Sequence, residues 1–220
     1  MQPELWDAVS GELRNLPQFR EQNGQTRIPL EFSVADSWFI VFRKKTSGQR
    51  STEEVNFPAP KPVMELTGEW NLQFDPKFGA PADTLINKLF DWTTDKNTAV
   101  KYYSGTATYR KEFIFNPLEN INYLLDVGEV ESFATVKLNG QELATLWRLP
   151  YRTDITGALK NGANILEVEV VNTWWNRVVG DARSGTAPYT WAATTVSWNA
   201  NSELLPAGLF GPVKIMTKDY

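Results

Sequence analysis

The feature that most constrains this fold is a series of short segments with alternating apolar residues, separated by turn residues. The clearest pair, Ser132–Leu138 and Gln141–Trp147, flanks Asn139-Gly140. A type I′ turn needs a positive φ at both central positions, which Asn and Gly tolerate, so these segments predict a β-hairpin. Another turn, at residues 160–162, leads into the apolar segment Asn164–Asn172. Because sustained helical periodicity is absent, the sequence predicts an all-β sandwich of the jelly-roll type.

Other segments have the same character and are bounded by Gly, Pro or Asn. We also expect one short helix, at Leu85–Asp91. The remaining expected strands are Glu4–Ala8, Glu12–Leu16, Thr26–Val34, Ser37–Arg43, Gly68–Phe74, Gly105–Phe115, Ile121–Val127 and Gly211–Met216. Short strands at such regular spacing are typical of sandwiches rather than of parallel sheets with covering helices.

A proline-rich segment divides the chain. Pro58, Pro60 and Pro62 occupy alternate positions, a pattern that favours an extended linker. At roughly 150 residues per domain, a chain of 220 residues suits one large domain plus a smaller piece. We predict a small β-sheet segment with its linker at residues 1–62, and a β-sandwich at residues 63–220. Because a small sheet alone leaves a face to be covered, the first segment is interpreted as the tail of a preceding domain.

Composition excludes several classes of function. The chain has no cysteine, which rules out disulfides, thiol nucleophiles and Cys-ligated metal centres, and no histidine, which rules out a Ser-His-Asp triad. The formal net charge is −4 without a basic stripe, so no nucleic-acid partner is expected. The longest apolar run, Trp38–Phe42, is too short to cross a membrane, and Met1–Glu4 does not resemble a signal peptide.

Several segments of the second part resemble a known family. Four of them are similar to the sugar-binding domain of family 2 glycoside hydrolases: Gly105–Phe113, Ala134–Gly140, Pro150–Thr156 and Leu159–Leu166. Two more, Asn172–Asp181 and Leu204–Val213, resemble the C-terminal jelly roll of family 106 glycoside hydrolases of the α-L-rhamnosidase type. The resemblance implies a galactose-binding-domain-like jelly roll over residues 63–216.

The resemblance also implies a role. Enzymes of this kind carry their catalytic carboxylates on an upstream barrel domain, so the chain is interpreted as a non-catalytic accessory domain of an α-L-rhamnosidase-like glycoside hydrolase. The implied partners are that catalytic domain and a carbohydrate, such as a rhamnose-containing glycan, and the implied location is secreted or periplasmic. Two alternatives remain: a protein-docking sandwich without affinity for sugars, and a self-sufficient glycosidase that uses two carboxylates.

Tryptophan indicates where a sugar could bind, because aromatic faces stack on the apolar side of pyranose rings. Five of the nine Trp residues lie between residues 147 and 198. The candidate carbohydrate-binding residues form two groups. The alternative interpretation of these residues is structural: the Trp side chains would pack in the core, and Arg177 would form an ion pair with Asp181. One group lies on the connection after the strand 164–172; the other lies near the edge that binds sugar in family 2 enzymes. They are Trp174, Trp175, Asn176, Arg177, Asp181 and Trp191 in the first group, and Trp147, Arg148 and Tyr151 in the second. We expect at least one of Trp174, Trp175 and Trp191 to be exposed.

Acidic residues give little support for catalysis. Asp126, Glu129 and Glu131 invite comparison with the carboxylate pair of glycosidases. Glu129 and Glu131 would share one strand face at about 7 Å, but alternating acids are common on solvated strands. We therefore assign no catalytic residue. No metal ligands and no cofactor are assigned, and a structural calcium ion is left open because galactose-binding-like folds often hold one.

Overall fold

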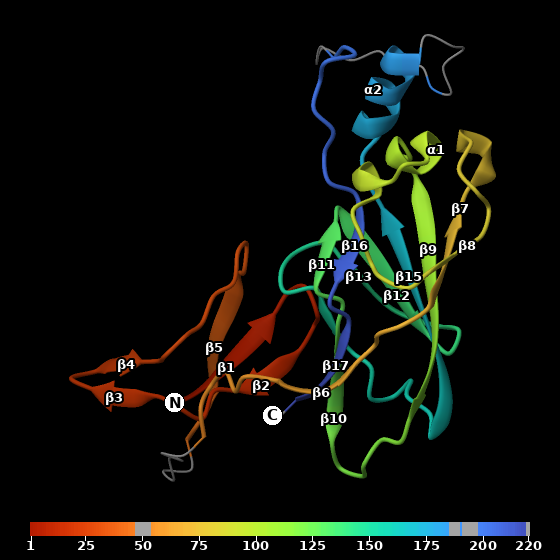
Figure 1. Ribbon diagram of the computed structural model, residues 1–220. Coiled ribbons are helices and arrows are strands. Elements are labelled where there is room, and N and C mark those ends of the chain that lie inside the picture. Colours follow the sequence, from red (N-terminus) through yellow and green to blue (C-terminus); the bar gives the residue numbers. More distant parts are fainter. Residues whose placement is uncertain (47–53, 185–189, 191–197, 219–220) are drawn as a thin grey trace. The chain divides into compact units, whose positions relative to one another are not determined.

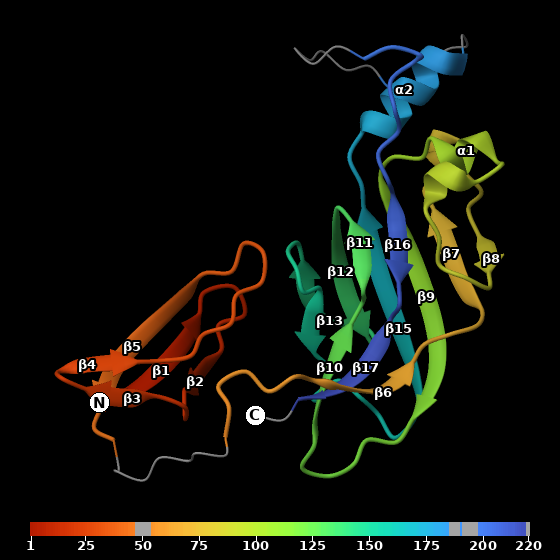
Figure 2. The same ribbon diagram turned by 60° about the vertical axis from the view of Figure 1, so that its left-hand side comes forward.

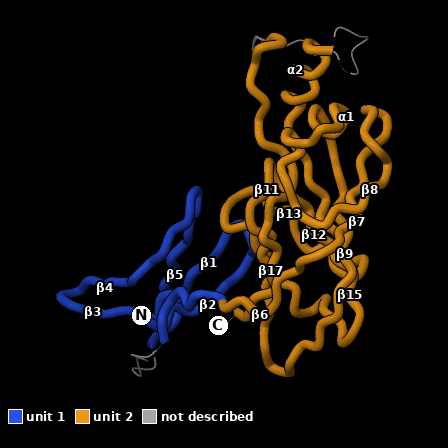
Figure 3. The backbone as a smooth tube through the Cα atoms, in the orientation of Figure 1, with its two compact units in different colours: residues 1–60, 219–220 blue, residues 61–218 orange. Residues whose placement is uncertain are grey.

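The computed structural model describes residues 1–46, 54–184, 190 and 198–218 (Figure 1). The chain forms two compact units, residues 1–60 and residues 61–218 (Figure 3). None of the helices within the described residues has the length and apolar character needed to cross a membrane.

Unit 1 is built on a three-stranded antiparallel sheet. Its strands are β1 (Gln2–Asp7), β2 (Leu13–Asn15) and β5 (Trp38–Lys44), in the order β2-β1-β5. The strands predicted at Glu4–Ala8 and Glu12–Leu16 correspond to β1 and β2, which form a hairpin whose turn contains Gly11 at φ 73°. A small separate hairpin joins β3 (Arg20–Gln22) to β4 (Gln25–Arg27).

One expectation for unit 1 is wrong. The strand predicted at Thr26–Val34 ends at Arg27, and residues 28–34 are irregular. Pro29 has no backbone N–H to contribute to a ladder, which removes the strand's continuation. The Pro29 carbonyl instead accepts a hydrogen bond of 2.9 Å from the side chain of the buried Asn56, which also bonds both backbone groups of Gln18.

Unit 2 contains a six-stranded antiparallel sheet in the order β13-β12-β15-β9-β7-β8. Its strands in chain order are β7 (Trp70–Phe74), β8 (Thr84–Ile86), β9 (Thr106–Phe115), β12 (Phe133–Leu138), β13 (Gln141–Leu146) and β15 (Gly162–Val171). The predicted hairpin between β12 and β13 is confirmed, with φ values of 55° at Asn139 and 82° at Gly140. The β12–β13 pairing contains a register shift between Val136 and Lys137.

The second layer of unit 2 is a four-stranded sheet in the order β14-β10-β17-β6. Figure 2 shows three of these strands, β10, β17 and β6. Its strands in chain order are β6 (Lys61–Glu65), β10 (Asn122–Asp126), β14 (Arg152–Asp154) and β17 (Lys214–Lys218). A short two-stranded ladder pairs β11 (Glu129–Glu131) with β16 (Gly208–Gly211). Buried side chains from both sheets form one apolar cluster, so unit 2 is the predicted all-β sandwich.

The core of the sandwich is rich in aromatic rings. The Tyr109 hydroxyl, which is buried, accepts hydrogen bonds from Trp92 Nε1 at 2.6 Å and from the Leu209 backbone N–H at 3.1 Å. Burial raises the pKa of the Tyr109 hydroxyl, so this group stays protonated. Ile155 is buried in the core, and Asp154 Oδ1 accepts a hydrogen bond of 2.9 Å from the Thr156 N–H in the adjoining turn.

Helices gather at one end of unit 2, and here two further expectations are wrong. The helix predicted at Leu85–Asp91 is absent: β8 occupies Thr84–Ile86, because Ile86 and Leu85 pair with the edge of β7. The residues after β15, expected in a loop, form the helix α2 (Trp175–Ser184). Helix α1 (Thr98–Lys101) and the 3-10 turns η1 (Pro76–Phe78) and η2 (Trp92–Thr94) are shorter. Figure 1 shows α1 and α2 at the same end.

Candidate functional site

Trp174 is the exposed aromatic residue at the start of α2. It lies between the end of β15 at Val171 and the first residue of α2, and 49% of its surface is exposed. Its ring lies edge-to-face against Phe78 of η1, with the ring centroids 5.1 Å apart. The expectation that at least one of Trp174, Trp175 and Trp191 is exposed is thereby confirmed, while Trp191 lies outside the described residues. Trp174 is thus available for stacking on a ligand.

Trp175 and Asn176 hold a neighbouring segment rather than face solvent. Trp175 Nε1 donates to the Glu203 carbonyl at 2.8 Å. The buried Asn176 side chain donates to the Leu205 carbonyl at 2.7 Å and accepts from the Leu205 N–H at 2.9 Å. These contacts satisfy backbone groups of residues 203–205, so both side chains are committed to the fold.

Arg177 and Asp181 form an ion pair one turn apart on α2. Arg177 Nε lies 3.1 Å from Asp181 Oδ1, and both side chains are buried. Arg177 also donates to the Phe78 carbonyl at 3.3 Å, and its backbone N–H donates to Ser104 Oγ at 3.1 Å. Asp181 Oδ2 accepts from the backbone N–H and the hydroxyl of Thr190. The geometry favours the structural ion pair over a direct contact with a ligand.

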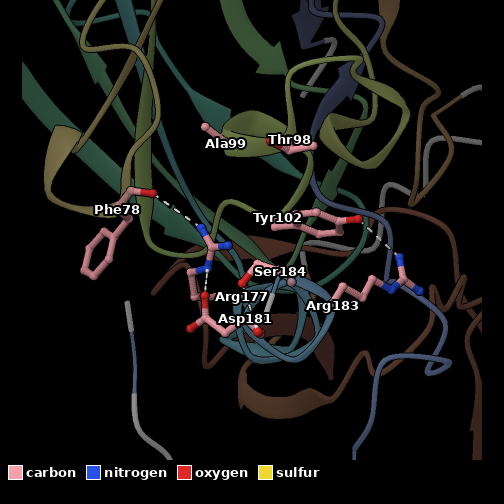
Figure 4. Close-up of a pocket in the computed structure, with 9 residues that line it drawn as sticks. Phe78, Thr98, Ala99, Tyr102, Arg177, Asp181, Arg183 and Ser184 are labelled. Carbon is pink, nitrogen blue, oxygen red and sulfur yellow. Dashed lines mark hydrogen bonds and ion pairs between the residues drawn. The ribbon is translucent and has the colours of Figure 1, made fainter. Parts of the chain in front are cut away.

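A hollow of about 430 Å³ lies between α1, α2 and η1 (Figure 4). Its wall includes the Arg177–Asp181 pair, Tyr102 and Arg183. The Arg183 guanidinium lies 5.7 Å from the centroid of the Tyr102 ring and donates to the carbonyls of Ala200 and Ser202. A volume of this order suits a small ligand, although most of its polar groups already have partners in the protein.

Trp147 and its neighbours form the second group of candidate residues. Trp147 follows β13 and is 56% exposed, whereas Arg148 and Tyr151 are half-buried. The Tyr151 carbonyl accepts a hydrogen bond from the Val127 N–H at 3.0 Å. Burial, with a contribution from the nearby Glu131 carboxylate, raises the pKa of the Tyr151 hydroxyl. Of these three residues, Trp147 presents the most surface to a ligand.

The strand order keeps the two groups apart. Trp147 follows β13 at one edge of the six-stranded sheet, while Trp174 follows β15, two strands further in. The Trp174 ring then packs on Phe78, which comes after β7 on the far side of β15. The candidate residues therefore define two separate surfaces at one end of the sheet, not one site.

The acidic residues considered for catalysis do not converge. Asp126 forms an ion pair with Arg152 at 2.7 Å. Glu129 and Glu131 are exposed and flank the buried Val130 on β11. Among the described residues, no three His, Cys, Asp or Glu side chains cluster closely enough to hold a metal ion.

Comparison with known proteins identifies the family. Residues 82–210, more than half of the chain, match the family model described as glycosyl hydrolase 2 galactose-binding domain-like. The chain therefore belongs to this family of galactose-binding-like domains. The match confirms the fold class and the resemblance to the sugar-binding domain of family 2 glycoside hydrolases. The closer assignment to family 106, at the C-terminus of such an enzyme, stays a prediction.

Longer proteins contain a region similar to this chain. The structure of a rhamnosidase from Novosphingobium sp. PP1Y matches 99% of this chain and 20% of its own, with 36% identity and a TM-score of 0.89. A protein of Formosa agariphila, provisionally named a beta-glucuronidase, is 36% identical over 71% of this chain and 16% of that protein. A beta-glucuronidase of Ruminococcus gnavus is 20% identical over 70% of this chain and 28% of its own, with a TM-score of 0.49. The chain thus spans a fifth or less of the first two proteins.

Proposed function

We propose that the chain is a non-catalytic accessory domain of a secreted or periplasmic glycoside hydrolase, which supports the catalytic domain and binds saccharide through exposed aromatic side chains. One observation carries this proposal: both units together match one fifth of a much longer rhamnosidase chain, over 99% of the present sequence. A region of that size beside a much larger remainder suits an accessory role. The substrate class suggested by this similarity is a rhamnose-containing glycan.

The chemistry of the described residues supports the non-catalytic part. Hydrolysis by two carboxylates requires a pair of acids across the scissile bond, about 5–9.5 Å apart depending on the mechanism. The hollow beside α2 is lined by one acid, Asp181, whose carboxylate is already paired with Arg177 and Thr190. Asp126 is paired with Arg152, which leaves it poorly suited to exchange protons with a substrate.

The saccharide-binding part rests on Trp147 and Trp174. Both are about half exposed and both lie where strands of the six-stranded sheet end. A pyranose ring presents C–H groups that pack on such indole faces, and neighbouring polar groups can bond its hydroxyls. These residues give the chain a surface on which a weak saccharide contact can form.

Two assays on the 220-residue chain test the proposal. We expect no release of nitrophenol from p-nitrophenyl α-L-rhamnoside or β-D-glucuronide at high protein concentration. We expect measurable heat when rhamnogalacturonan oligosaccharides are titrated into the same protein. Turnover that disappears on substitution of one acidic residue would overturn the non-catalytic assignment, and a flat titration would favour a protein-docking module without sugar affinity.

A further inference from the structure

The register of β12 and β13 places two aromatic side chains together on the outer face of the six-stranded sheet. Beyond the register shift, Ala134 pairs with Leu146, and both are buried. Continuing this register one residue past the end of β13 sets Trp147 opposite Phe133, on the other face of the sheet because side chains alternate. Phe133 is 38% exposed and pairs on its other side with Val171 of β15. Trp147, Phe133 and Val171 thus form one apolar row across three strands.

The next row on the same face is polar. Thr135 pairs with Thr145 on one side and with Glu169 on the other. The two threonine hydroxyls lie 3.1 Å apart, and Glu169 is 2.7 Å from Lys137 Nζ. Successive residues on one strand face are about 7 Å apart, so these groups border the aromatic row. An apolar row can pack on the C–H face of a pyranose, and the adjacent hydroxyl and charged groups can hydrogen-bond to its hydroxyls.

The dimensions of the apolar row decide between a sugar and a protein as its ligand. A stable protein interface buries about 800 Å² on each partner, whereas this row consists of three side chains followed by a polar row. Further along the same face the outward residues are Thr108, Arg110 and Glu167, which are not apolar. The row therefore matches the apolar face of one or two pyranose rings better than it matches a protein surface.

We propose that the outer face of β12–β13 is a saccharide platform, on which a neutral pyranose stacks over Phe133 and Trp147. Thr135, Thr145 and the Lys137–Glu169 pair then bond hydroxyls at the rim of the ring. This inference rests on the proposed accessory function and specifies the site at which saccharide binds. It assigns Phe133, Thr135 and Thr145 to the site in addition to Trp147, and leaves Trp174 outside it.

Saturation-transfer difference NMR tests the platform with two probes, methyl α-L-rhamnopyranoside and methyl β-D-glucopyranoside. The proteins compared are the wild-type chain, Trp147→Ala, Phe133→Ala, Trp174→Ala and the control Phe39→Ala, which removes an exposed ring of unit 1. We expect transfer to ring C–H protons in the wild type, at least a fivefold loss in the first two variants, a smaller loss in Trp174→Ala, and little change in the control. Because the substituted side chains are exposed, all four variants should keep the wild-type melting temperature.

A second pair of variants tests the polar row without touching the rings. Thr135→Val and Thr145→Val keep the side-chain shape, and each should weaken the transfer several-fold. Unchanged transfer in Trp147→Ala and Phe133→Ala would overturn the platform; if Trp174→Ala then loses the signal, the accessory function stands and its site lies beside α2. Absence of transfer to both probes in the wild-type chain would overturn the platform together with the saccharide-binding part of the proposed function.

Discussion

At the scale of single residues, the structure separates side chains that hold the fold from those free to meet a ligand. In the segment that follows β15, Trp175, Asn176 and Arg177 each bond a backbone group of another segment, whereas Trp174 is half exposed. Trp175, Asn176 and Arg177, whose residue types suggest a binding motif, therefore have mainly structural roles. A ligand contact there depends on Trp174.

Glu4 of unit 1 gives a prediction about pH. Hydrogen bonds from Lys44 and Arg43 lower the pKa of the Glu4 carboxyl from 4.5 to about 2. Because the folded pKa lies below the unfolded one, this interaction stabilises unit 1 above pH 4.5 and its contribution is lost as the pH falls toward 2. In Glu4→Gln, the free energy of unfolding should therefore change less between pH 6 and pH 3 than in the wild type.

The measurement for Glu4 is a urea titration at both pH values, followed by the NMR signal of the Trp6 indole N–H. This indole donates to Glu4 and reports on the same sheet. Glu31→Gln, at an exposed position of the same unit, serves as the control and should keep the wild-type pH dependence. Equal pH dependence in Glu4→Gln and the wild type would contradict the assigned ion pairs.

Gly180 on α2 gives a prediction about packing. A Cβ atom at this position would lie 2.5 Å from the side chain of Tyr102, a distance that forces the helix or the ring to move. We expect Gly180→Ala to lower the free energy of unfolding by about 1–3 kcal/mol, as overpacking does. Gly157→Ala is the matched control, since nothing lies within 4 Å of its Cβ position. Urea denaturation of both variants provides the comparison, and equal stabilities would contradict close packing between α2 and Tyr102.

At the scale of elements, local turn chemistry explains why some of the fold could be predicted. Asn139-Gly140 fixes the β12–β13 hairpin because both residues accept a positive φ, and the structure shows this conformation. Helix α2 could not be predicted in the same way, since the polar residues Asn176 and Arg177 are buried in it together with Val178, Val179 and Gly180, so it lacks a purely apolar buried face. It is defined by hydrogen bonds to residues distant in the sequence.

The proposed saccharide platform could be predicted only in part, because its composition depends on the register of the β12–β13 hairpin. Simple counting outward from Asn139-Gly140 would pair Phe133 with Leu146 and turn Trp147 toward the core. The register shift between Val136 and Lys137 adds one residue to β13, so that Ala134 pairs with Leu146 and the continued register sets Trp147 opposite Phe133. Trp147 was therefore a candidate from its residue type, while its partner Phe133 required the structure.

Asn139 gives a prediction at this scale. Its side chain donates to the Ala158 carbonyl and to Asn164 Oδ1, and accepts from the Ile165 N–H at 3.0 Å. Asn139→Gly keeps the positive φ but removes these bonds, and should lower the free energy of unfolding by about 1–3 kcal/mol. Asn139→Ala should lower it further, because alanine also resists the positive φ. Urea denaturation ranks the variants, and a more stable alanine variant would contradict the described turn.

At the scale of the whole molecule, the chain is a family 2 galactose-binding-like sandwich with a smaller unit before it. The same two-unit stretch matches part of a rhamnosidase chain about five times its length. In the proposed accessory function, the exposed side chains of Trp147 and Trp174 contact the saccharide.

Affinity electrophoresis is the most direct test of saccharide binding through the exposed Trp side chains. The wild-type chain and the double variant Trp147→Ala/Trp174→Ala are run in native gels with and without rhamnogalacturonan, beside a reference protein that does not bind glycans. We predict that the glycan retards the wild-type chain and leaves the double variant at its mobility in the plain gel. Equal mobility of both proteins in the two gels, or equal retardation of both by the glycan, would contradict saccharide binding through these exposed aromatic residues.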